Sequence, residues 1–410
     1  MTMRSPGWTR REFLRGAAAV AAAAPLPFAF GAGLPTTDAA GTPPNVSAQR
    51  RPDTKVAIVS CTAYGPEVRA AMKEALDLLG GLGSLVKGKT VTVKLNLTGT
   101  DFTPFLDRPV GETFITHEAT ALALVGLLFD AGARRVRFAE STQSRSGLAD
   151  TLALAKWDVN ALRALGRIEF ENTRNLGSGK QYAELKVPDG GRMFSSFQLN
   201  HAYAETDVMV SLCKLKQHVT TGVTLSMKNL FGLTPNSLYG DEAGSEDATA
   251  GRGVIHAPGD GWDPKRFEQR QFKLPGLKPA KTLSSDPGVR VPRTIVDLCA
   301  ARPVHLAIID GITAMCGGEG PWCGNVGPMR LMKPGILIVG LNPVATDAVG
   351  AAVMGADDPR APRGTPPFRL SENHLLLAEQ AGLGPADLAQ IEVLGRSVEK
   401  ALCPYPPLKV

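Results

Sequence analysis

The sequence predicts an α/β fold built on an open, mostly parallel sheet flanked by helices. Six short apolar runs rich in β-branched residues recur after residue 52, and segments with helical periodicity separate several of them. Alternating buried strands and amphipathic helices are typical of a mainly parallel sheet covered by helices. Polar residues directly follow most of the apolar runs, so we expect polar side chains to cluster at the carboxyl ends of the strands.

The expected elements can be placed in order along the chain. A helix follows the first strand, because apolar residues repeat at helical spacing over 68–79. A second helix is expected over 116–132, because apolar residues share one helical face and Gly132 can end the helix. A third is expected over 343–354, because Pro343 suits the first turn of a helix and Gly355 can end it. The six strands are expected at residues 55–61, 91–96, 134–141, 206–214, 303–311 and 335–342.

The amino-terminal residues resemble a twin-arginine translocation signal. Residues 9–15 read TRREFLR and precede an alanine-rich apolar run that Pro25 and Pro27 interrupt. A membrane span needs about 20 strongly apolar residues, so we expect residues 1–33 to be a cleaved signal peptide that leaves no stable membrane span. The resemblance implies the twin-arginine export machinery as a partner and a periplasmic or extracellular location.

The remaining chain is expected to form one large domain. Residues 34–52 are rich in Pro, Thr and Ala and predict a flexible leader. Residues 53–400 are assigned to a single α/β domain, with 401–410 as a tail. Residues 236–292 have little apolar periodicity and many Gly, Pro and charged residues, which predicts a loop-rich insertion or a lid.

Composition and charge argue against a nucleic-acid-binding protein. Four arginines and one glutamate give residues 1–33 a net charge of +3, which is half of the +6 of the whole chain. Aromatic residues make up only 6% of the chain, and no Lys/Arg run is interleaved with them. A nucleic-acid-binding surface normally combines such a run with aromatics, so we expect no nucleic-acid partner.

The cysteines and histidines leave the identity of any metal open. An iron–sulfur cluster normally needs thiolates in tight runs, and this chain has none, so such a cluster is not expected. Disulfides are permitted in an exported protein, and Cys316 and Cys323 are the nearest pair, but nothing determines the pairing. The six histidines show no zinc-binding spacing. The six cysteines are residues 61, 213, 299, 316, 323 and 403.

The polar residues after the strands predict a shared cleft, because ligands of open α/β sheets bind outside the carboxyl ends of the strands. Each such residue alone would be an ordinary loop residue. The residues concerned are Lys94 and Asn96, Glu140 and Ser141, Lys214, Lys216 and His218, Asp310, and Asn342 with Asp347 in the helix that follows.

The segment KLKQHVTTGVTLSMKNLFGLTP (214–235) holds the densest set of candidate ligand-binding groups. Lysines, hydroxyls and a glycine that permits close backbone approach suit an anionic group, either a phosphate or a carboxylate. The segment does not match a P-loop, and a solvated basic loop is the alternative. The expected cofactor-binding residues are Lys94, Asn96, Lys214, Lys216, Gly222, Lys228 and Asn229.

Three residues are candidates for catalysis. His218 lies in the basic segment, and Asp310 and Glu319 flank a glycine-rich loop after a buried run. Two carboxylates can act as acid and base or bind a divalent cation, although Asp310 can equally cap a turn. Arg252 and His256 are expected to reach the cleft from the insertion.

Four segments of the chain carry a resemblance to a known family. They are VKLN at 93–96, SLCKLKQHVTTGVTLSMKNLFGL at 211–233, AIIDGITAMCGGEGP at 307–321 and ILIVGLNPVATDAVGAAVMG at 336–355. With these segments the chain resembles the domain of unknown function 362 family over roughly residues 53–396. Many relatives carry an added ferredoxin-like cysteine cluster, which this chain lacks, so the resemblance does not extend to an iron–sulfur redox role.

These observations predict an exported enzyme whose cleft binds a small carboxylate, a phosphate or a phosphate-bearing cofactor. A divalent metal is left open. The alternative is a periplasmic binding or accessory protein, which needs the same anion site without catalysis. A looser similarity to the nickel-pincer lactate racemases, in which His218, Gly222 and Lys228 occupy comparable places, makes a racemase-like enzyme a minor alternative.

Overall fold

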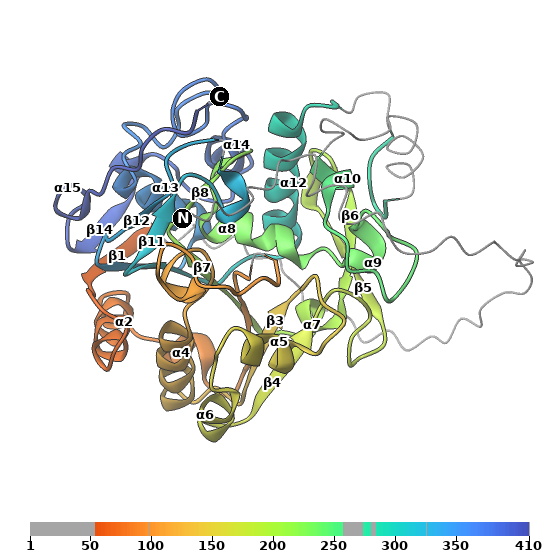
Figure 1. The fold of residues 1–410 in the computed structure, drawn as a ribbon, viewed down its shortest axis with the longest axis horizontal. Coiled ribbons are helices and arrows are strands. Elements are labelled where there is room, and N and C mark those ends of the chain that lie inside the picture. Colours follow the sequence, from red (N-terminus) through yellow and green to blue (C-terminus); the bar gives the residue numbers. More distant parts are fainter. Residues whose placement is uncertain (1–53, 98, 257–273, 280–283, 325, 410) are drawn as a thin grey trace, which may run out of the picture.

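The computed structural model describes residues 54–97, 99–256, 274–279, 284–324 and 326–409 (Figure 1). The expected signal peptide and leader lie outside the described residues. So does much of the second half of the expected insertion.

An eight-stranded sheet forms the centre of the fold, in the order β14-β1-β13-β10-β7-β2-β3-β4. Every neighbouring pair is parallel except that β13 runs antiparallel to both β1 and β10. The α/β prediction and its six strands are confirmed, while the two edge strands, β4 and β14, were not expected. The strands are β1 (Lys55–Ser60), β2 (Thr90–Lys94), β3 (Arg135–Glu140), β4 (Ile168–Asn172), β7 (Val208–Lys214), β10 (Leu306–Gly311), β13 (Ile336–Gly340) and β14 (Glu392–Gly395).

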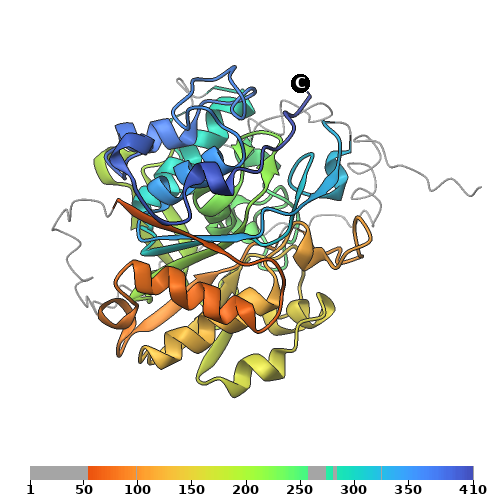
Figure 2. The ribbon, with the colours of Figure 1, turned by 90° about the vertical axis from the view of Figure 1, so that its left-hand side faces the viewer.

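Helices cover both faces of the sheet and make three layers (Figures 1 and 2). Helices α2 (Glu67–Leu78) and α4 (Glu118–Asp130) lie on one face. The other face carries α8 (Leu225–Asn229), α12 (Pro287–Ala301), α13 (Pro343–Val353) and α14 (His374–Gln380). The three helices expected from periodicity are therefore confirmed as α2, α4 and α13.

Each face of the sheet has its own hydrophobic core. Along β1, Val56 and Ile58 belong to the core beneath α13, whereas Ala57 and Val59 belong to the core beneath α2. Successive side chains of a strand point to opposite faces, and both sets are buried, which explains why the strands read as continuous apolar runs.

Smaller elements surround the three layers. Three two-stranded pairs, β5–β6, β8–β9 and β11–β12, are separate from the main sheet. They are β5 (Tyr182–Lys186) with β6 (Ser196–Asn200), β8 (Gln217–His218) with β9 (Gly222–Val223), and β11 (Ala314–Cys316) with β12 (Arg330–Met332). The short helices are α3 (Gly83–Val86), α5 (Leu148–Leu154), α6 (Val159–Ala164), α7 (His201–Ala204), α9 (Asn236–Tyr239), α10 (Gly253–His256) and α15 (Val398–Ala401), and the 3₁₀ helices are η1 (Val110–Glu112), η2 (Pro188–Gly190), η3 (Leu230–Leu233), η5 (Pro321–Cys323) and η6 (Leu388–Gln390).

The antiparallel direction of β13 corrects the expectation of one common edge. Gly340, at the carboxyl end of β13, pairs with Val56 near the start of β1. Asn342 therefore lies at the edge opposite to the carboxyl ends of the parallel strands. Its side chain instead caps α13 by accepting the backbone N–H groups of Val344 and Ala345, at 2.9 and 3.0 Å.

Described parts of the expected insertion and of the tail pack against the rest of the protein. Residues 287–292 belong to α12, whose first turn carries Pro287 after the capping residue Asp286. Within the first part of the insertion, Tyr239 is fully buried. In the tail, the Tyr405 hydroxyl donates a hydrogen bond to the carbonyl of Leu215 at 2.8 Å, so this segment packs against the core.

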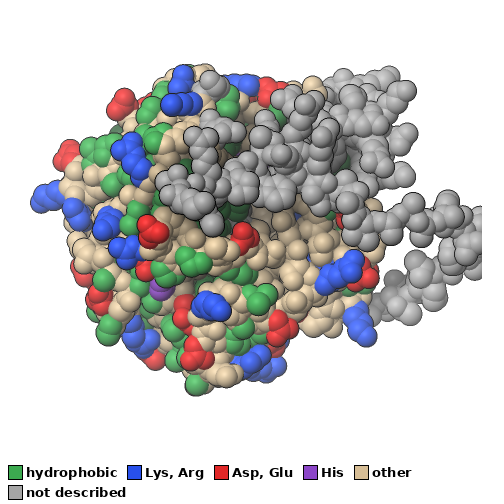
Figure 3. Space-filling view, viewed as in Figure 1, with side chains coloured by type: hydrophobic (Ala, Val, Ile, Leu, Met, Phe, Trp, Pro, Cys, Tyr) green, Lys and Arg blue, Asp and Glu red, His purple; other side chains and the backbone are tan. Residues whose placement is uncertain are grey.

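The surface carries charges of both signs. Figure 3 shows Lys and Arg side chains interspersed with Asp and Glu on one face of the molecule. All six cysteines are free, so neither the Cys316–Cys323 pair nor any other is joined. Among the described residues, no helix is long and apolar enough to cross a membrane.

Candidate functional site

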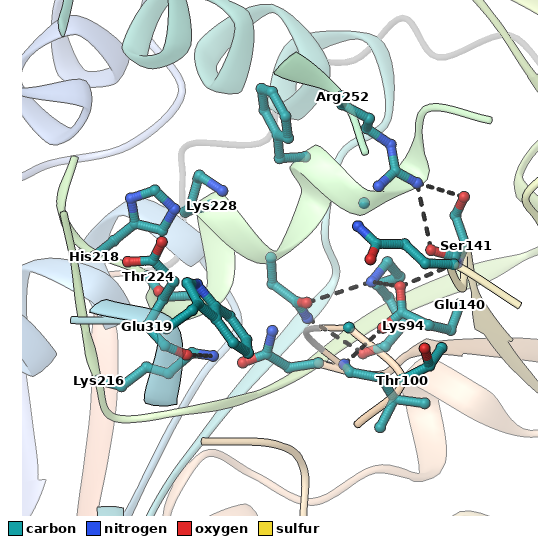
Figure 4. Close-up of a pocket in the computed structure, with 18 of the residues that line it drawn as sticks. Lys94, Thr100, Glu140, Ser141, Lys216, His218, Thr224, Lys228, Arg252 and Glu319 are labelled. Carbon is teal, nitrogen blue, oxygen red and sulfur yellow. Dashed lines mark hydrogen bonds and ion pairs between the residues drawn. The ribbon is translucent and has the colours of Figure 1, made fainter. Parts of the chain in front are cut away.

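A pocket of about 440 Å³ lies at the carboxyl ends of the adjacent parallel strands β2, β3 and β7 (Figure 4). This is the position where open α/β sheets bind ligands. Most of the residues expected at the site line this pocket. They are Lys94, Asn96, Lys216, His218, Lys228, Asn229 and Glu319, together with Arg252 and His256 of the insertion.

Lys214 and Asp310 do not reach the pocket. Their side chains lie on the face of the sheet that α2 and α4 cover. Successive side chains of β7 point to opposite faces, and Lys214 points away from the face that carries the pocket. Lys214 Nζ lies 3.1 Å from Oδ2 of Asp310, and neither side chain is exposed. The Tyr64 hydroxyl donates to Oδ1 of Asp310 at 2.9 Å. The expected ligand-binding and catalytic roles of this pair are therefore not supported by its position.

Gly222 is also outside the pocket. It begins β9 with a φ of 76°, in the left-handed region that favours glycine. A Cβ at this position would collide with the carbonyl oxygen of Pro367. Gly222 is thus required for the close approach of two backbone segments, and the expectation that it meets a ligand is corrected.

The floor of the pocket is a buried ion pair between Lys94 and Glu140. Lys94 Nζ lies 2.6 Å from Glu140 Oε1 and donates to the Leu95 carbonyl at 2.7 Å. Glu140 Oε2 accepts the backbone N–H of Leu97 at 2.8 Å. Burial lowers the pKa of Lys94, and Glu140 opposes that shift. Gly232 leaves room for the pair, since a Cβ there would lie 2.9 Å from Lys94 Nζ.

Lys228 has an amine with no hydrogen-bond or ion-pair partner among the described residues. The residue is only 9% exposed, and its Nζ lies 4.5 Å from the centroid of the Phe231 ring. Burial is the main cause that lowers the pKa of Lys228 to about 8, while Glu319 opposes the shift. The site therefore contains a buried cation whose counter-ion is a nearby carboxylate without direct contact.

Arg252 contributes a second cation from the insertion. Its Nε donates to the carbonyl of Thr234 at 2.7 Å, and its Nη2 donates to Ser141 Oγ and to Asn236 Oδ1, the latter at 3.0 Å. These bonds fix the guanidinium beside the end of β3, while Nη1 makes no hydrogen bond with a described residue. Figure 4 shows the Lys228 amine and the Arg252 guanidinium pointing into the same cavity.

Asn96 lines the pocket and has one unsatisfied acceptor. The residue is 7% exposed, and its Oδ1 is buried without a hydrogen-bond partner among the described residues. A buried polar atom left unpaired costs about 1–3 kcal/mol.

The two histidines of the pocket present opposite hydrogen-bonding groups. His218 Nδ1 accepts the backbone N–H of Thr220 at 3.1 Å, so its proton is on Nε2. His256 Nδ1 lies 2.9 Å from the Arg252 carbonyl, which can only accept, so its Nε2 carries the lone pair. Burial lowers the pKa of both rings, that of His256 to about 4, and keeps them neutral. The pocket thus holds one imidazole donor and one imidazole acceptor.

Glu319 is the carboxylate beside His218 (Figure 4). Its Oε2 accepts the backbone N–H of Val219 at 3.0 Å. Burial alone would raise the pKa of Glu319, but the backbone N–H of Val219 holds it below its usual range. We assign the charge to Glu319 and the neutral state to His218, because the carboxylate accepts a backbone N–H and faces the lysines of the pocket.

The Lys216 amine forms hydrogen bonds that hold the wall of the pocket. Its Nζ donates to the carbonyls of Phe114 and Glu319, at 2.7 and 3.1 Å. Burial is the main cause that lowers its pKa to about 7. The amine therefore joins the glycine-rich loop to the segment before α4, at the wall of the pocket.

Asp347 lies outside the pocket and binds the first residues of a helix that lines it. Its carboxylate accepts the backbone N–H groups of Ser226 and Met227, both at 2.8 Å. These groups begin α8, the short helix that carries Lys228 and Asn229. The sequence places Asp347 among the polar residues that are expected to line the shared cleft. Instead its carboxylate caps a different helix.

Several lining residues were missed by the sequence analysis, among them Phe231, Gly232 and Trp322. Phe231 and Gly232 lie in the segment 214–235, which the sequence already marks as the densest set of candidate ligand-binding groups. Among the described residues, no group of three or more His, Cys, Asp or Glu side chains is arranged to hold a metal ion.

Comparison with known proteins identifies the family. A 173-residue stretch is 30% identical to a thylakoid-associated protein, sll1697, of Synechocystis, covering 41% of this chain and 47% of that protein. The chain thus spans about half the length of the curated relative it matches. No solved structure matches the chain. Residues 91–352 match the family described as "Domain of unknown function (DUF362)". This match covers most of the chain and includes the strands and loops that build the pocket. The chain belongs to the DUF362 family.

Proposed function

We propose that this protein is an exported enzyme whose pocket binds a small anionic ligand, either a carboxylate, a phosphate or a phosphate-bearing cofactor. The observation that carries the proposal is the Lys228 amine, which is buried and lacks a direct partner among the described residues. Burying an unpaired charge is costly. An anion bound against Lys228 would supply the missing partner.

The groups around Lys228 support the same ligand class. Arg252 brings a second cation, and His218 offers a neutral N–H donor from its Nε2. The floor pair of Lys94 and Glu140 is internally satisfied, so we propose that it shapes the pocket. Donors that converge in one pocket are effective for oxyanions, because charge-assisted hydrogen bonds are the stronger ones.

The proposal of catalysis rests on His218, His256 and Glu319. A neutral imidazole donor and a neutral imidazole acceptor in one pocket are suited to giving and taking a proton. Glu319 lies beside His218 and is held in its charged form. Asp310 is omitted from the proposed catalytic set, because its carboxylate is paired with Lys214 on the other face of the sheet.

A periplasmic binding or accessory protein is the second candidate. The position of Asp310 favours it, since catalysis by Asp310 and Glu319 together would require both carboxylates near His218. A racemase-like enzyme is a minor alternative. Native mass spectrometry with elemental analysis of protein purified without chelator distinguishes the candidates: bound nickel favours the racemase-like enzyme, and a bound organic phosphate favours a cofactor enzyme.

Export through the twin-arginine machinery is part of the proposal and rests on Arg10 and Arg11. Replacing both arginines by lysine should retain the full-length precursor in the cytoplasm, as measured by cell fractionation and intact mass. Equal export of the variant and the parent protein would contradict this part of the proposal.

Calorimetric titration with inorganic phosphate tests the anion site. Lys228→Met should weaken phosphate binding at least about tenfold while leaving the melting temperature nearly unchanged, because the amine has no hydrogen-bond or ion-pair partner among the described residues. Lys278→Met is the matched control, since Lys278 donates to the Gly191 carbonyl outside the pocket. Unchanged phosphate affinity in Lys228→Met, or no binding to the parent protein, would refute the phosphate version of the proposal.

A further inference from the structure

Trp322 is unusually exposed for a tryptophan that lines a pocket. It lies in η5, within the glycine-rich loop after β11, and is 43% exposed. Tryptophan is highly buried on average. An exposed aromatic residue in the wall of a pocket is a common means of binding the flat face of a ligand.

The indole is held in place by its neighbours. The Phe114 ring packs edge-on against it, with centroids 5.7 Å apart and planes at 83°. A Cβ at Gly320 would collide with the indole, and a Cβ at Gly99 would lie 3.9 Å from it. Phe114 is itself fully buried, and its carbonyl accepts a hydrogen bond from Lys216. The ring is therefore supported on one side and open on the other, so little ordering is needed when a ligand binds.

The pocket is larger than a simple anion requires. Its volume of about 440 Å³ falls in the range of about 300–1,000 Å³ that is usual for sites of small organic ligands. Two of its cationic groups, Lys228 and Arg252, are accompanied by the apolar side chains of Leu97, Phe231 and Trp322. A ligand that used both kinds of wall would carry an anionic group and an apolar, flat part.

We propose that the ligand is a nucleoside monophosphate or a compound of that class, whose planar ring stacks on Trp322 while its phosphate is held by Lys228. The inference rests on the proposed anion site and specifies its ligand. Stacking tolerates the identity of the base, because every base has a π-face. The ring should therefore add affinity for both purine and pyrimidine nucleotides.

The test compares AMP and UMP with ribose 5-phosphate, which lacks the base, by calorimetric titration of the full chain. Both nucleotides should bind about 5- to 150-fold more tightly than ribose 5-phosphate, as expected for one base stacked on an aromatic side chain. Binding of ribose 5-phosphate without any gain for the nucleotides would overturn this inference and leave the anion site standing. Absence of binding by all three probes would instead count against the anion site.

Two variants separate stacking from a structural role. Trp322→Ala should remove the advantage of the nucleotides and leave the affinity for ribose 5-phosphate unchanged, and Trp322→Phe should retain part of the advantage. Trp157→Phe is the control, because Trp157 is 6% exposed and packs against Phe138 in the core beneath α4. Equal loss of all three ligands in Trp322→Ala would show that Trp322 only supports the loop, and would refute the proposal.

Discussion

Lys214 and Asp310 face each other across the neighbouring strands β7 and β10, with Nζ 3.1 Å from Oδ2 and neither side chain exposed. Tyr64 joins the pair by donating to Asp310 Oδ1. The residues are direct partners in the parallel register, so the backbone pairing itself places the two charges together. Lys214 and Asp310, which the sequence suggests for ligand binding and catalysis, are thus buried in the interior of the protein.

Removing one partner of this pair should destabilise the protein strongly. Asp310→Asn leaves the Lys214 charge buried and unpaired, and the expected loss is about 3–5 kcal/mol of unfolding free energy. Urea unfolding measures it. The double variant Lys214→Met/Asp310→Leu should be more stable than Asp310→Asn, because it leaves no uncompensated charge. Phosphate affinity of the folded fraction should stay unchanged, and a specific loss of binding at full stability would contradict this structural role.

Anion binding should weaken as Lys228 loses its proton. The pKa of Lys228 is lowered to about 8, mainly by burial, and only the protonated amine pairs with an anion. Sulfate is a suitable probe because its charge does not change between pH 6 and 10. Its affinity should fall above about pH 8 in the parent protein, in addition to the decrease near pH 7 that deprotonation of Lys216 causes, whereas Lys228→Met should bind weakly at every pH. A flat profile in the parent protein would argue that the amine is not a ligand.

Asp347→Asn should weaken phosphate binding through α8. The variant removes a carboxylate that accepts the N–H groups of Ser226 and Met227, at a cost of about 1–3 kcal/mol in stability. Asp297→Asn is the matched control, since Asp297 is buried and also accepts backbone N–H groups but lies outside the pocket. Both variants should lose stability, and only Asp347→Asn should lose phosphate affinity. Equal affinity in the two variants would show that Asp347 does not position Lys228.

The same carboxylate should make stability depend on pH. Burial raises the pKa of Asp347 from 3.8 to about 7, so the folded protein binds this proton more tightly than the unfolded chain. Its contribution to stability is therefore full below about pH 4 and decreases as the pH rises to about 7. The difference in unfolding free energy between the parent protein and Asp347→Asn should fall over that interval. A pH-independent difference would show that the group does not titrate there.

Gly222→Ala should destabilise the protein without a direct effect on ligand contacts. The substitution places a Cβ at a left-handed φ and against the Pro367 carbonyl. The expected cost exceeds about 1 kcal/mol, and thermal unfolding measures it. Gly364→Ala is a useful comparison, because Gly364 also has a positive φ but has open space around it. Gly222→Ala should be the more destabilising of the two, and the reverse order would refute the steric argument.

The spacing of apolar and polar residues along the sequence determined the α/β class, the inner strands and the edge of the sheet at which the pocket lies. These properties follow from local spacing. Val91 and Val93 alternate with polar residues, and Lys94 and Asn96 come directly after that run. The segment 214–235 likewise brought Lys228 forward as a candidate, with a solvated basic loop as the alternative.

Only the tertiary structure decided which of these side chains meet. Lys94 and Lys214 both end strands, yet they lie on opposite faces of the sheet, because Val93 and Val210 are register partners within one core. The direction of β13 and the contact between Asp347 and α8 also depend on pairing between segments far apart in the chain. Such pairing is set by the packing of the whole molecule, and local sequence spacing carries no information about it.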